Sequence, residues 1–325
     1  LPSFALTVDN VNIVANICHQ LDGLPLAIEM AAARVNVLTV AQIANRLDDH
    51  FALLAPAEHV SHSPHRTLRA AIDWSYDLLT APEQLLLQRL SVLARGCSLN
   101  TAEMVCVEEE IEQEQMLDPL SSLVNKSLVA AVTLQRSQAR YILLETIRQY
   151  AQEKLAASDE WSGLHNRHLQ HFLRLAEETR PKLTGQYQQL WLDWLEDEYD
   201  NLRAALSWSL ESGDIESGLR IAIAIYEFWT IRDYAEEGLA WIEQLLDRVV
   251  AGVPAVVRAT ALAYATFLAG FRGNSAAQAA YGREAADLAE ALGAEGQSAL
   301  AWARAGEAYA QGRPGPLPSG GSVLA

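Results

Sequence analysis

The stretch Cys18-His-Gln-Leu-Asp-Gly-Leu-Pro-Leu-Ala-Ile-Glu-Met-Ala-Ala-Ala-Arg34 decides the fold of the N-terminal part of the chain. Upstream, Asp9 or Asn10 can cap a helix whose apolar residues recur at helical spacing, namely Val11, Val14, Cys18 and Leu21. Gly23 favours the left-handed conformation that ends a helix, and Pro25 suits the first turn of the next one, where its missing N–H is no loss. Residues 8–35 are therefore predicted to form two helices about a tight corner.

Downstream of this corner, capping boxes and apolar spacing predict further short helices. Thr39 with Gln42 starts one, and the stretch from Pro56 to Arg66 then reads as an inter-domain loop. Residues 67–79 have helical spacing. A capping box of Thr80 and Glu83 is predicted to begin a helix that Gly96 ends. Asn100 with Glu103 is predicted to begin the next helix. Further on, one helical face is predicted along Leu117, Leu120, Leu123 and Val124.

The period then changes from helix to strand. Residues 127–132 and 139–143 are predicted strands around a polar loop with Arg136 and Ser137, and 145–155 returns to helix. Helices followed by a β-hairpin are the element order of a winged-helix domain. The domains predicted from these patterns, together with those of the C-terminal half, are 1–66 as a helical subdomain, 67–157 as a winged helix, 158–213 as connecting helices, 214–312 as helical repeats and 313–325 as a flexible tail.

The C-terminal half shows a recurrence at 40 residues. Arg232-Asp-Tyr-Ala-Glu-Glu-Gly238 and Arg272-Gly-Asn-Ser-Ala-Ala-Gln278 occupy equivalent corners, and a further corner is predicted at 311–313. The pattern is similar to degenerate tetratricopeptide repeats, whose stacked hairpins build a concave binding surface, although an ordinary helical bundle gives much of the same signal. The predicted fold class is mainly α: a helical subdomain and a winged helix with a small β-hairpin, followed by a tetratricopeptide-like α-solenoid.

Charge and composition exclude several classes of protein. The 325 residues are 50% hydrophobic with a net charge of −17, and segments 1–66, 67–157 and 158–325 carry −3, −4 and −10. None offers the phosphate-neutralising surface on which nucleic-acid affinity depends. No apolar run predicts a membrane span or a signal peptide, and three cysteines without zinc-type spacing fit a reducing compartment, so we expect a cytoplasmic protein.

Four motifs resemble bacterial NB-ARC/STAND-type signal-transduction ATPases with numerous domains, many of them transcriptional regulators of the LuxR or SARP type. They are Gly23-Leu-Pro-Leu26, Thr67–Leu79, Tyr141–Ala151 and Asp200-Asn-Leu-Arg-Ala-Ala-Leu206. The resemblance implies that Gly23, Leu24, Pro25 and Leu26 bind nucleotide, with Pro25 packed on the adenine ring. In relatives, a Met-His-Asp motif places its histidine on the β-phosphate of ADP. The matching positions here are Leu143, Leu144 and Glu145, so the histidine that makes this contact is absent and Leu144 is expected in the core.

The same resemblance places the phosphate-binding loop upstream of the first motif. The chain's lysines at 126, 154 and 182 follow Asn, Glu and Pro, so no Gly-Lys-Ser/Thr sequence is present. Only 22 residues precede Gly23 and the first residue is Leu1, which favours a fragment lacking this loop. ATP or ADP is then a cofactor of the parent protein, and we expect none to bind the fragment alone.

Other candidate sites have simpler explanations. Both histidine triplets are expected to be solvated or interfacial rather than metal sites. On a helix, the spacings of three and six in His165, His168 and His171 spread the rings over about 120°. The loop triplet of His59, His62 and His65 has no nearby acidic or cysteine partner apart from Glu58. Acidic runs at 108–110 and 196–198 are typical of solvated faces. Aromatic residues at helical spacing favour core positions, although some could line a concave face, especially among Tyr226, Phe228, Trp229, Tyr234 and Trp241.

These patterns leave two functions open. The first is part of an ATP/ADP-dependent signalling switch with transcriptional control as its output. In it, the repeats sense an effector protein or small ligand and the winged helix acts as a lid. DNA is then bound only through a module outside this chain, and the family resemblance implies a nucleotide-dependent oligomer. The alternative is a nucleotide-independent protein-interaction scaffold. No catalytic arrangement is discernible, so the chain itself is not expected to be an enzyme, and the parent is at most a slow ATPase.

Overall fold

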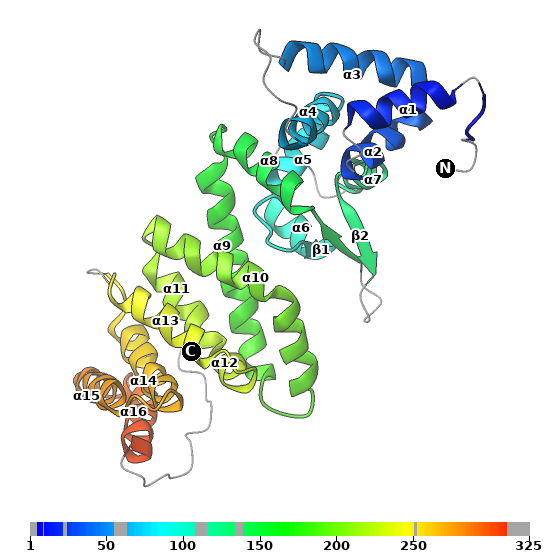
Figure 1. Cartoon of the computed structure of the whole chain (residues 1–325). Coiled ribbons are helices and arrows are strands. Elements are labelled where there is room, and N and C mark those ends of the chain that lie inside the picture. The colour runs from blue at the N-terminus through cyan, green and yellow to red at the C-terminus, as the bar shows by residue number, and fades with distance from the viewer. Residues whose placement is uncertain are drawn as a thin grey trace. The chain divides into compact units, whose positions relative to one another are not determined.

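A computed structural model describes residues 5–8, 10–21, 25–54, 64–107, 116–133, 139–249 and 252–310. The chain divides into two compact units, Leu1–Leu164 and His165–Ala325, and each is treated by itself below (Figure 1). Both are built mainly from helices, with one small sheet in the first unit, so the predicted fold class is confirmed. Among the described residues, no helix is both long and apolar enough to cross a membrane.

The first unit begins with short helices around one apolar core. These are α1 (Val11–Gln20), α2 (Pro25–Ala32), the 3₁₀ helix η1 (Ala33–Asn36), α3 (Val40–Leu54) and α4 (Pro64–Asp77). The core residues include Ile17 of α1 and Leu21 directly after it, and α4 adds Ala71 and Trp74. Val11, predicted on the buried face of α1, is instead 43% exposed. The buried face lies one step around the helix, along Ile13, Ile17 and Leu21 at spacings of four.

The predicted capping boxes are present. The Thr39 backbone N–H donates to Gln42 Oε1 (2.9 Å) and the Gln42 N–H donates back to Thr39 Oγ1 (3.2 Å) at the start of α3. The Thr80 N–H donates to Glu83 Oε2 (2.7 Å) before α5. Because these contacts satisfy N–H groups that have no partner within the helix, they fix where both helices begin.

The rest of the first unit carries the elements of a winged helix. In chain order they are α5 (Ala81–Leu90), β1 (Cys97–Ser98), α6 (Leu99–Cys106), α7 (Leu117–Asn125), β2 (Ala130–Thr133), β3 (Ala139–Ile142) and α8 (Glu145–Ala156). The three strands form one antiparallel sheet in the order β1-β3-β2. Ala131 pairs with Tyr141 on one side of β3, and Cys97 pairs with Tyr141 on the other.

Three local predictions in this region are wrong. Helix α6 is capped by Ser98, whose side chain accepts from the Thr101 N–H, and Asn100 lies inside the helix. Strand β2 starts at Ala130, later than predicted, because Ser127 takes a left-handed conformation (φ 57°) in the turn after α7. Helix α5 ends at Leu90, so Gly96 does not stop it.

Gly96 has a different role, in the sheet. Its φ is +84°, and a Cβ placed there would lie 2.2 Å from the Tyr141 carbonyl oxygen. Only glycine allows this approach of the backbone to β3. Gly96 therefore permits the short strand β1, which the sequence patterns did not predict.

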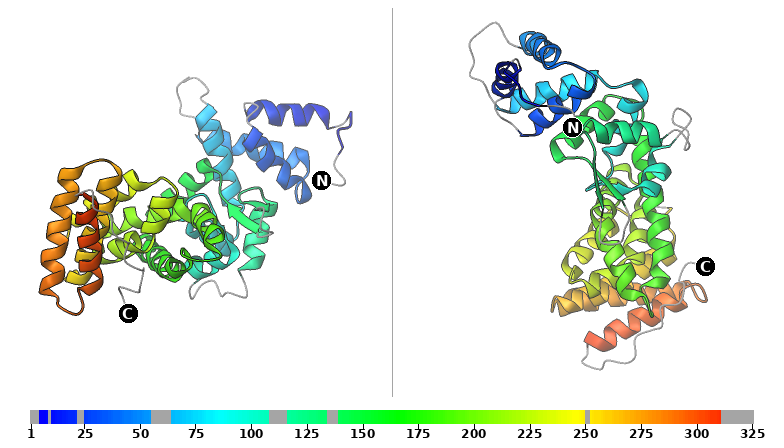
Figure 2. Two further views of the ribbon diagram at one scale, coloured as in Figure 1. Left: turned by 90° about the horizontal axis from the view of Figure 1, so that it is seen from below. Right: turned by 90° about the vertical axis from the view of Figure 1, so that its right-hand side faces the viewer.

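The second unit is a series of helices joined by tight corners. They are α9 (Trp161–Thr179, most of it in this unit), η3 (Arg180–Lys182), α10 (Gln188–Ser212), α11 (Ile215–Ala224), α12 (Tyr226–Ile231), α13 (Ala235–Leu246), α14 (Ala255–Phe271), α15 (Ser275–Ala291) and α16 (Gln297–Ala310). Helices α14, α15 and α16 lie side by side, in orange and red in Figure 2. Ala259, Ala289 and Ala299 meet between them, and their small side chains permit close packing.

The 40-residue recurrence is confirmed as a repeated backbone geometry. Asp233 and Gly273 both take the left-handed conformation, with φ of 64° and 70°. The next residue in each corner donates its N–H five residues back, from Tyr234 to the Trp229 carbonyl (2.8 Å) and from Asn274 to the Ala269 carbonyl (3.1 Å). Each corner therefore ends its helix with the same hydrogen bond of a Schellman motif. The predicted corner at 311–313 and the tail at 313–325 lie outside the described residues.

Candidate functional site

Pro25, the predicted adenine contact, is the first residue of α2 and is exposed. The helix below it is anchored, because Ala27, Met30 and Ala31 are buried. Gly23, Leu24 and the side chain of Leu26 lie outside the described residues. An exposed proline ring on an anchored helix offers an apolar surface but no N–H donor for phosphate. The assignment of these residues to nucleotide binding stays a prediction.

Arg34, the last residue of the opening stretch, ties that stretch to α4. Its guanidinium is buried, and Nη2 donates to the Ser75 carbonyl oxygen (3.2 Å) in the last turn of α4, where the helix dipole favours a cation. Burial lowers the pKa of Arg34, and the nearby Glu83 carboxylate opposes that shift. A contact over 41 residues leaves no local sequence signal, so Arg34 was not predicted as a site residue.

At the position of the Met-His-Asp motif, the structure separates the two leucines. Leu143 is buried, whereas Leu144 is 46% exposed, so the predicted core place of Leu144 is wrong. Residues 143 and 144 have extended backbone between β3 and α8, where neighbours face opposite sides, and Leu143 takes the inward position. Glu145 starts α8, and Arg148 donates to both of its carboxylate oxygens (2.9 and 2.7 Å), which lowers the pKa of Glu145.

In the winged-helix elements, cations are bound by groups of the same unit. The Lys126 ammonium lies 2.5 and 2.6 Å from the two carboxylate oxygens of Glu83. Burial alone would raise the pKa of Glu83, but hydrogen bonds led by that of Lys126 lower it. Lys126 directly follows α7, the helix that enters the major groove when such a domain reads DNA. Its charge is therefore neutralised where a DNA reader would present it to phosphate.

Other cations of these elements are engaged in the same way. Arg89 is fully buried and donates to both oxygens of Glu160 (2.8 and 2.6 Å) and to the Cys106 carbonyl (3.0 Å). Arg140 donates to the backbone carbonyls of Arg95 and Gly96. The Lys154 ammonium lies 5.2 and 5.1 Å from the ring centroids of Tyr76 and Tyr150. Helix α7 itself contains no basic residue, and its exposed side carries Asp118.

The histidines at 165, 168 and 171 do not gather around an ion. No group of metal-ligating side chains occurs in the described part of the chain. His168 and His171 are buried, whereas solvated or interfacial positions were predicted, and burial lowers their pKa values to about 3 and about 4. Both rings pack against Phe172. They are therefore uncharged at neutral pH and belong to the core of the second unit. His59, His62 and the side chain of His65 lie outside the described residues.

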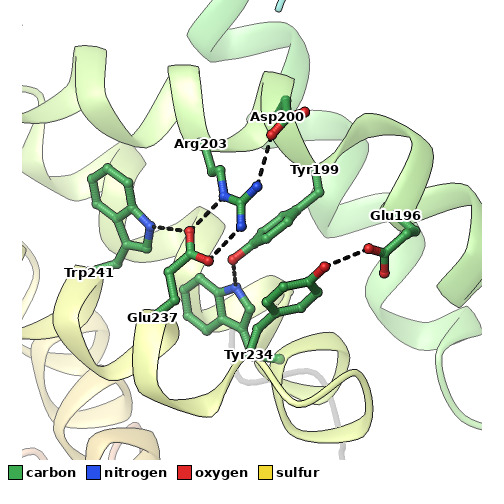
Figure 3. Close-up of polar contacts among 8 residues, drawn as sticks. Glu196, Tyr199, Asp200, Arg203, Tyr234, Glu237 and Trp241 are labelled. Carbon is green, nitrogen blue, oxygen red and sulfur yellow. Dashed lines mark hydrogen bonds and ion pairs between the residues drawn. The ribbon is translucent and has the colours of Figure 1, made fainter. Parts of the chain in front are cut away.

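A polar and aromatic cluster joins α10 to the first repeat corner (Figure 3). Arg203 donates to both carboxylate oxygens of Glu237 on α13 (2.7 and 2.6 Å) and to Asp200 Oδ1 (2.8 Å). Its guanidinium carbon also lies 4.0 Å from the centroid of the Tyr199 ring. Arg203 therefore connects two helices through charge-assisted hydrogen bonds and a cation–π contact.

Aromatic hydrogen bonds complete this cluster. The Trp229 indole N–H donates to the Tyr199 hydroxyl (2.7 Å), and the Tyr234 hydroxyl donates to Glu196 (2.6 Å). Hydrogen bonds from Arg203 outweigh burial and lower the pKa of Glu237, whereas burial first and then the Glu237 charge raise that of Tyr199. Each of these carboxylates has a donor, so the cluster is a structural joint and is not arranged for acid–base chemistry.

The cluster explains two sequence features. Asp200 and Arg203 of the Asp-Asn-Leu-Arg motif lie on one helix face at a spacing of three, while Leu202, Ala205 and Leu206 are buried. The acidic run at 196–198 is only partly solvated, because Glu198 is buried and accepts from Asn201 Nδ2 (2.7 Å). The spacing of Asp200 and Arg203 in the sequence indicates that they share a helix face. Glu237 lies on another helix, so no local sequence pattern indicates its contact with Arg203.

Most of the aromatic residues considered for a recognition surface lie in the core. Tyr226 is 5% exposed, and Phe228 and Trp229 are fully buried. Tyr234 and Trp241 are half-buried, and both contribute to the cluster in Figure 3. Substitutions of Tyr226 or Trp229 are therefore expected to lower the stability of the second unit, whatever their effect on ligand recognition.

Comparisons with known proteins identify one domain and several longer relatives. A family model described as "Winged helix-turn-helix domain" matches residues 79–156. Over 246 residues the chain is 41% identical to proteins named "Putative HTH-type transcriptional regulator" in Mycobacterium bovis and Mycobacterium tuberculosis, a match over 76% of this chain and 28% of theirs. An uncharacterized Mycobacterium tuberculosis protein is 42% identical over 169 residues, covering 52% of this chain and 43% of its own.

The chain thus spans less than a third of the length of the first of these relatives. A solved signal-transduction ATPase with numerous domains and a tetratricopeptide repeat sensor, from Pyrococcus horikoshii, is 13% identical, with a TM-score of 0.38 over 89% of this chain and 45% of that one. The domain match agrees with the strand order and the helices α5 to α8 described above. Residues 79–156 of this chain form a winged helix-turn-helix domain.

Proposed function

We propose that this chain is the regulatory part of a transcriptional regulator that works as an ATP/ADP-dependent signalling switch in the cytoplasm. In this proposal the winged helix is a protein-facing lid, the helical hairpins of the second unit sense an effector, and DNA is bound by a module outside the chain. The relatives named as transcriptional regulators support the general class. The motifs at 23–26 and 200–206 support the switch family.

One observation carries the lid assignment, namely the engagement of cations within the first unit. Residues 79–156 hold seven basic and ten acidic side chains, a net charge of −3. Of the basic ones, Arg89, Lys126 and Arg148 are held by carboxylates, Arg140 by backbone carbonyls, and Lys154 by aromatic rings. Because protein–DNA affinity depends on cations that neutralise phosphates, a domain in which five of seven cations are already bound within the protein is poorly suited to reading DNA.

A mobility-shift experiment tests this assignment. Residues 1–325 should not shift random duplex DNA at about 0.1 M salt. At this salt concentration the screening length is about 10 Å, so basic residues that contact the phosphates would still attract them. A variant with Asp118→Lys and Ser121→Lys should gain weak, salt-sensitive binding, because both side chains are exposed on α7. This variant is the positive control, because its binding would show that α7 is accessible to DNA in the assay. Retention of duplex DNA by the unmodified chain would contradict the lid assignment.

Nucleotide binding in the parent protein is proposed on the position of Pro25. Its exposed ring gives an adenine-side surface, and the printed sequence contains no Gly-Lys-Ser or Gly-Lys-Thr for the phosphates. We expect residues 1–325 to bind ATP or ADP more weakly than roughly millimolar, because apolar contact with one ring supplies little free energy. Isothermal titration calorimetry measures this directly, with a Pro25→Ala variant as control. Saturable micromolar binding would show that the chain holds a complete site.

The scaffold alternative is favoured by the same engaged cations, since it also needs no DNA contact. We propose no catalysis by this chain under either function, because the titratable groups described above serve as structural ion pairs. The two functions differ in the parent protein: a switch loses its response to effector when ATP is removed, and a scaffold keeps its partners.

A further inference from the structure

Three aromatic residues of the second unit recur every 38 residues and meet. Tyr226 begins α12, Tyr264 lies in α14 and Trp302 lies in α16. The rings of Tyr226 and Tyr264 stack with centroids 4.2 Å apart at 13°, and Trp302 meets Tyr264 edge-on at 5.2 Å and 88°. They are 5%, 0% and 5% exposed. These residues, the aromatic ladder below, occupy equivalent places in successive hairpins.

Two charged side chains of opposite sign border the aromatic ladder. Arg180 Nη2 donates to the Tyr264 hydroxyl (2.5 Å), and the Arg180 guanidinium carbon lies 5.8 Å from the Tyr264 ring centroid. Glu227 directly follows Tyr226 in α12. Burial raises the pKa of Glu227 and the positive charge of Arg180 opposes that shift, so the two side chains interact electrostatically. No ion pair between Arg180 or Glu227 and another side chain occurs among the described residues.

Two polar atoms here are buried without a partner. Glu227 Oε2 and the Trp302 indole Nε1 have no hydrogen-bond partner within the described ranges. Buried polar atoms are nearly always hydrogen-bonded in folded proteins, and an acceptor and a donor left over around one aromatic cluster point to a ligand that carries both a donor and an acceptor group. Arg180 is only partly buried, so the cluster reaches the surface of the unit at this residue.

The chemistry of these groups selects one class of ligand. A carboxylate beside electron-rich rings binds an ammonium group, through a charge-assisted hydrogen bond and cation–π attraction. A guanidinium without an acidic partner binds a carboxylate, and the indole N–H is a further donor to such a group. A ligand with only one of these charges would leave either Glu227 or Arg180 without an ionic partner.

We propose that Arg180, Glu227 and the aromatic ladder form a binding site for a small zwitterion of the amino acid class. The ligand's ammonium group lies at Glu227 and its carboxylate at Arg180. This inference rests on the sensing role proposed above and names the chemical class of its effector.

Calorimetry on residues 1–325 tests the site with the twenty common L-amino acids, one at a time at millimolar concentration. At least one should give a saturable heat. For that amino acid, the N-acetyl and carboxamide derivatives should each bind about tenfold to hundredfold more weakly, because each removes one charge. The variants Glu227→Gln and Arg180→Met should show the same loss. Glu236→Gln, which alters an exposed glutamate paired with Arg272, is the matched control and should bind as the unmodified chain does.

Binding of none of these amino acids would overturn the site, and so would equal binding of the N-acetyl derivative or of the Glu227→Gln variant. Circular dichroism establishes whether each variant is folded. If Glu227→Gln does not fold, the two ligand derivatives still decide the question on the unmodified chain. An amino acid that binds here but leaves the response of the parent regulator unchanged would refute the sensing role and leave the site intact.

Discussion

Replacing Trp229 with alanine should lower the free energy of unfolding of the second unit by about 3–5 kcal/mol. Trp229 is fully buried, and its indole packs on Gly238 so closely that a Cβ on that glycine would lie 2.4 Å from the ring. The substitution opens a cavity and removes the donor to the Tyr199 hydroxyl. Chemical denaturation followed by circular dichroism measures the change.

The matched control for Trp229 is another large apolar residue of the same unit. Phe271 is 63% exposed, and Phe271→Ala should change the free energy of unfolding by no more than about 0.5 kcal/mol. If Trp229→Ala instead left stability unchanged and removed the effector response of the parent regulator, Trp229 would be a recognition residue and its place in the core would be refuted.

The second large effect is expected at Glu160. Its carboxylate is the ionic partner of Arg89, whose side chain is fully buried. Glu160→Ala should destabilise the first unit by about 3–5 kcal/mol, because it leaves a buried cation without a counter-charge. The double variant Arg89→Met with Glu160→Ala should recover much of this loss, since it removes the buried charge itself. Denaturation curves of the two variants give the comparison.

The control for Glu160 is an ion pair at the surface of the same unit. Arg148→Ala breaks the pair with Glu145, whose side chain is 60% exposed, and should cost less than about 1 kcal/mol. If Glu160→Ala lowered the free energy of unfolding no more than Arg148→Ala does, the prediction that the buried ion pair stabilises the first unit would be refuted.

Much of the fold could be predicted from local sequence patterns. The capping boxes at Thr39 and Thr80 depend on contacts three residues apart, and the corners at 232 and 272 depend on one left-handed residue each. Such signals lie within a few neighbouring residues of the sequence. Strand β1 was missed because two residues cannot show alternation, and it exists only through its pairing with β3.

The candidate sites were predicted less well, because their contacts are long-range. The partner of Arg203, Glu237, is 34 residues away, and that of Arg89, Glu160, is 71 residues away. The burial of His168 and the exposure of Leu144 likewise depend on which helix packs where. Local spacing identifies residues that share a helix face, but it does not identify what faces them.

Helix α4 has a consequence for where the winged-helix domain can be cut from this chain. The winged-helix match starts at residue 79, after α4 has ended. Yet the Tyr150 hydroxyl of α8 donates to Asp73 (2.6 Å), and Lys154 covers the ring of Tyr76. On its other side, α4 contributes Trp74 to the core of α1 to α3. The segment that the winged-helix family model matches is therefore smaller than the set of elements that pack together, and residues 79–156 in isolation would lose the partners that α4 gives to Tyr150 and Lys154.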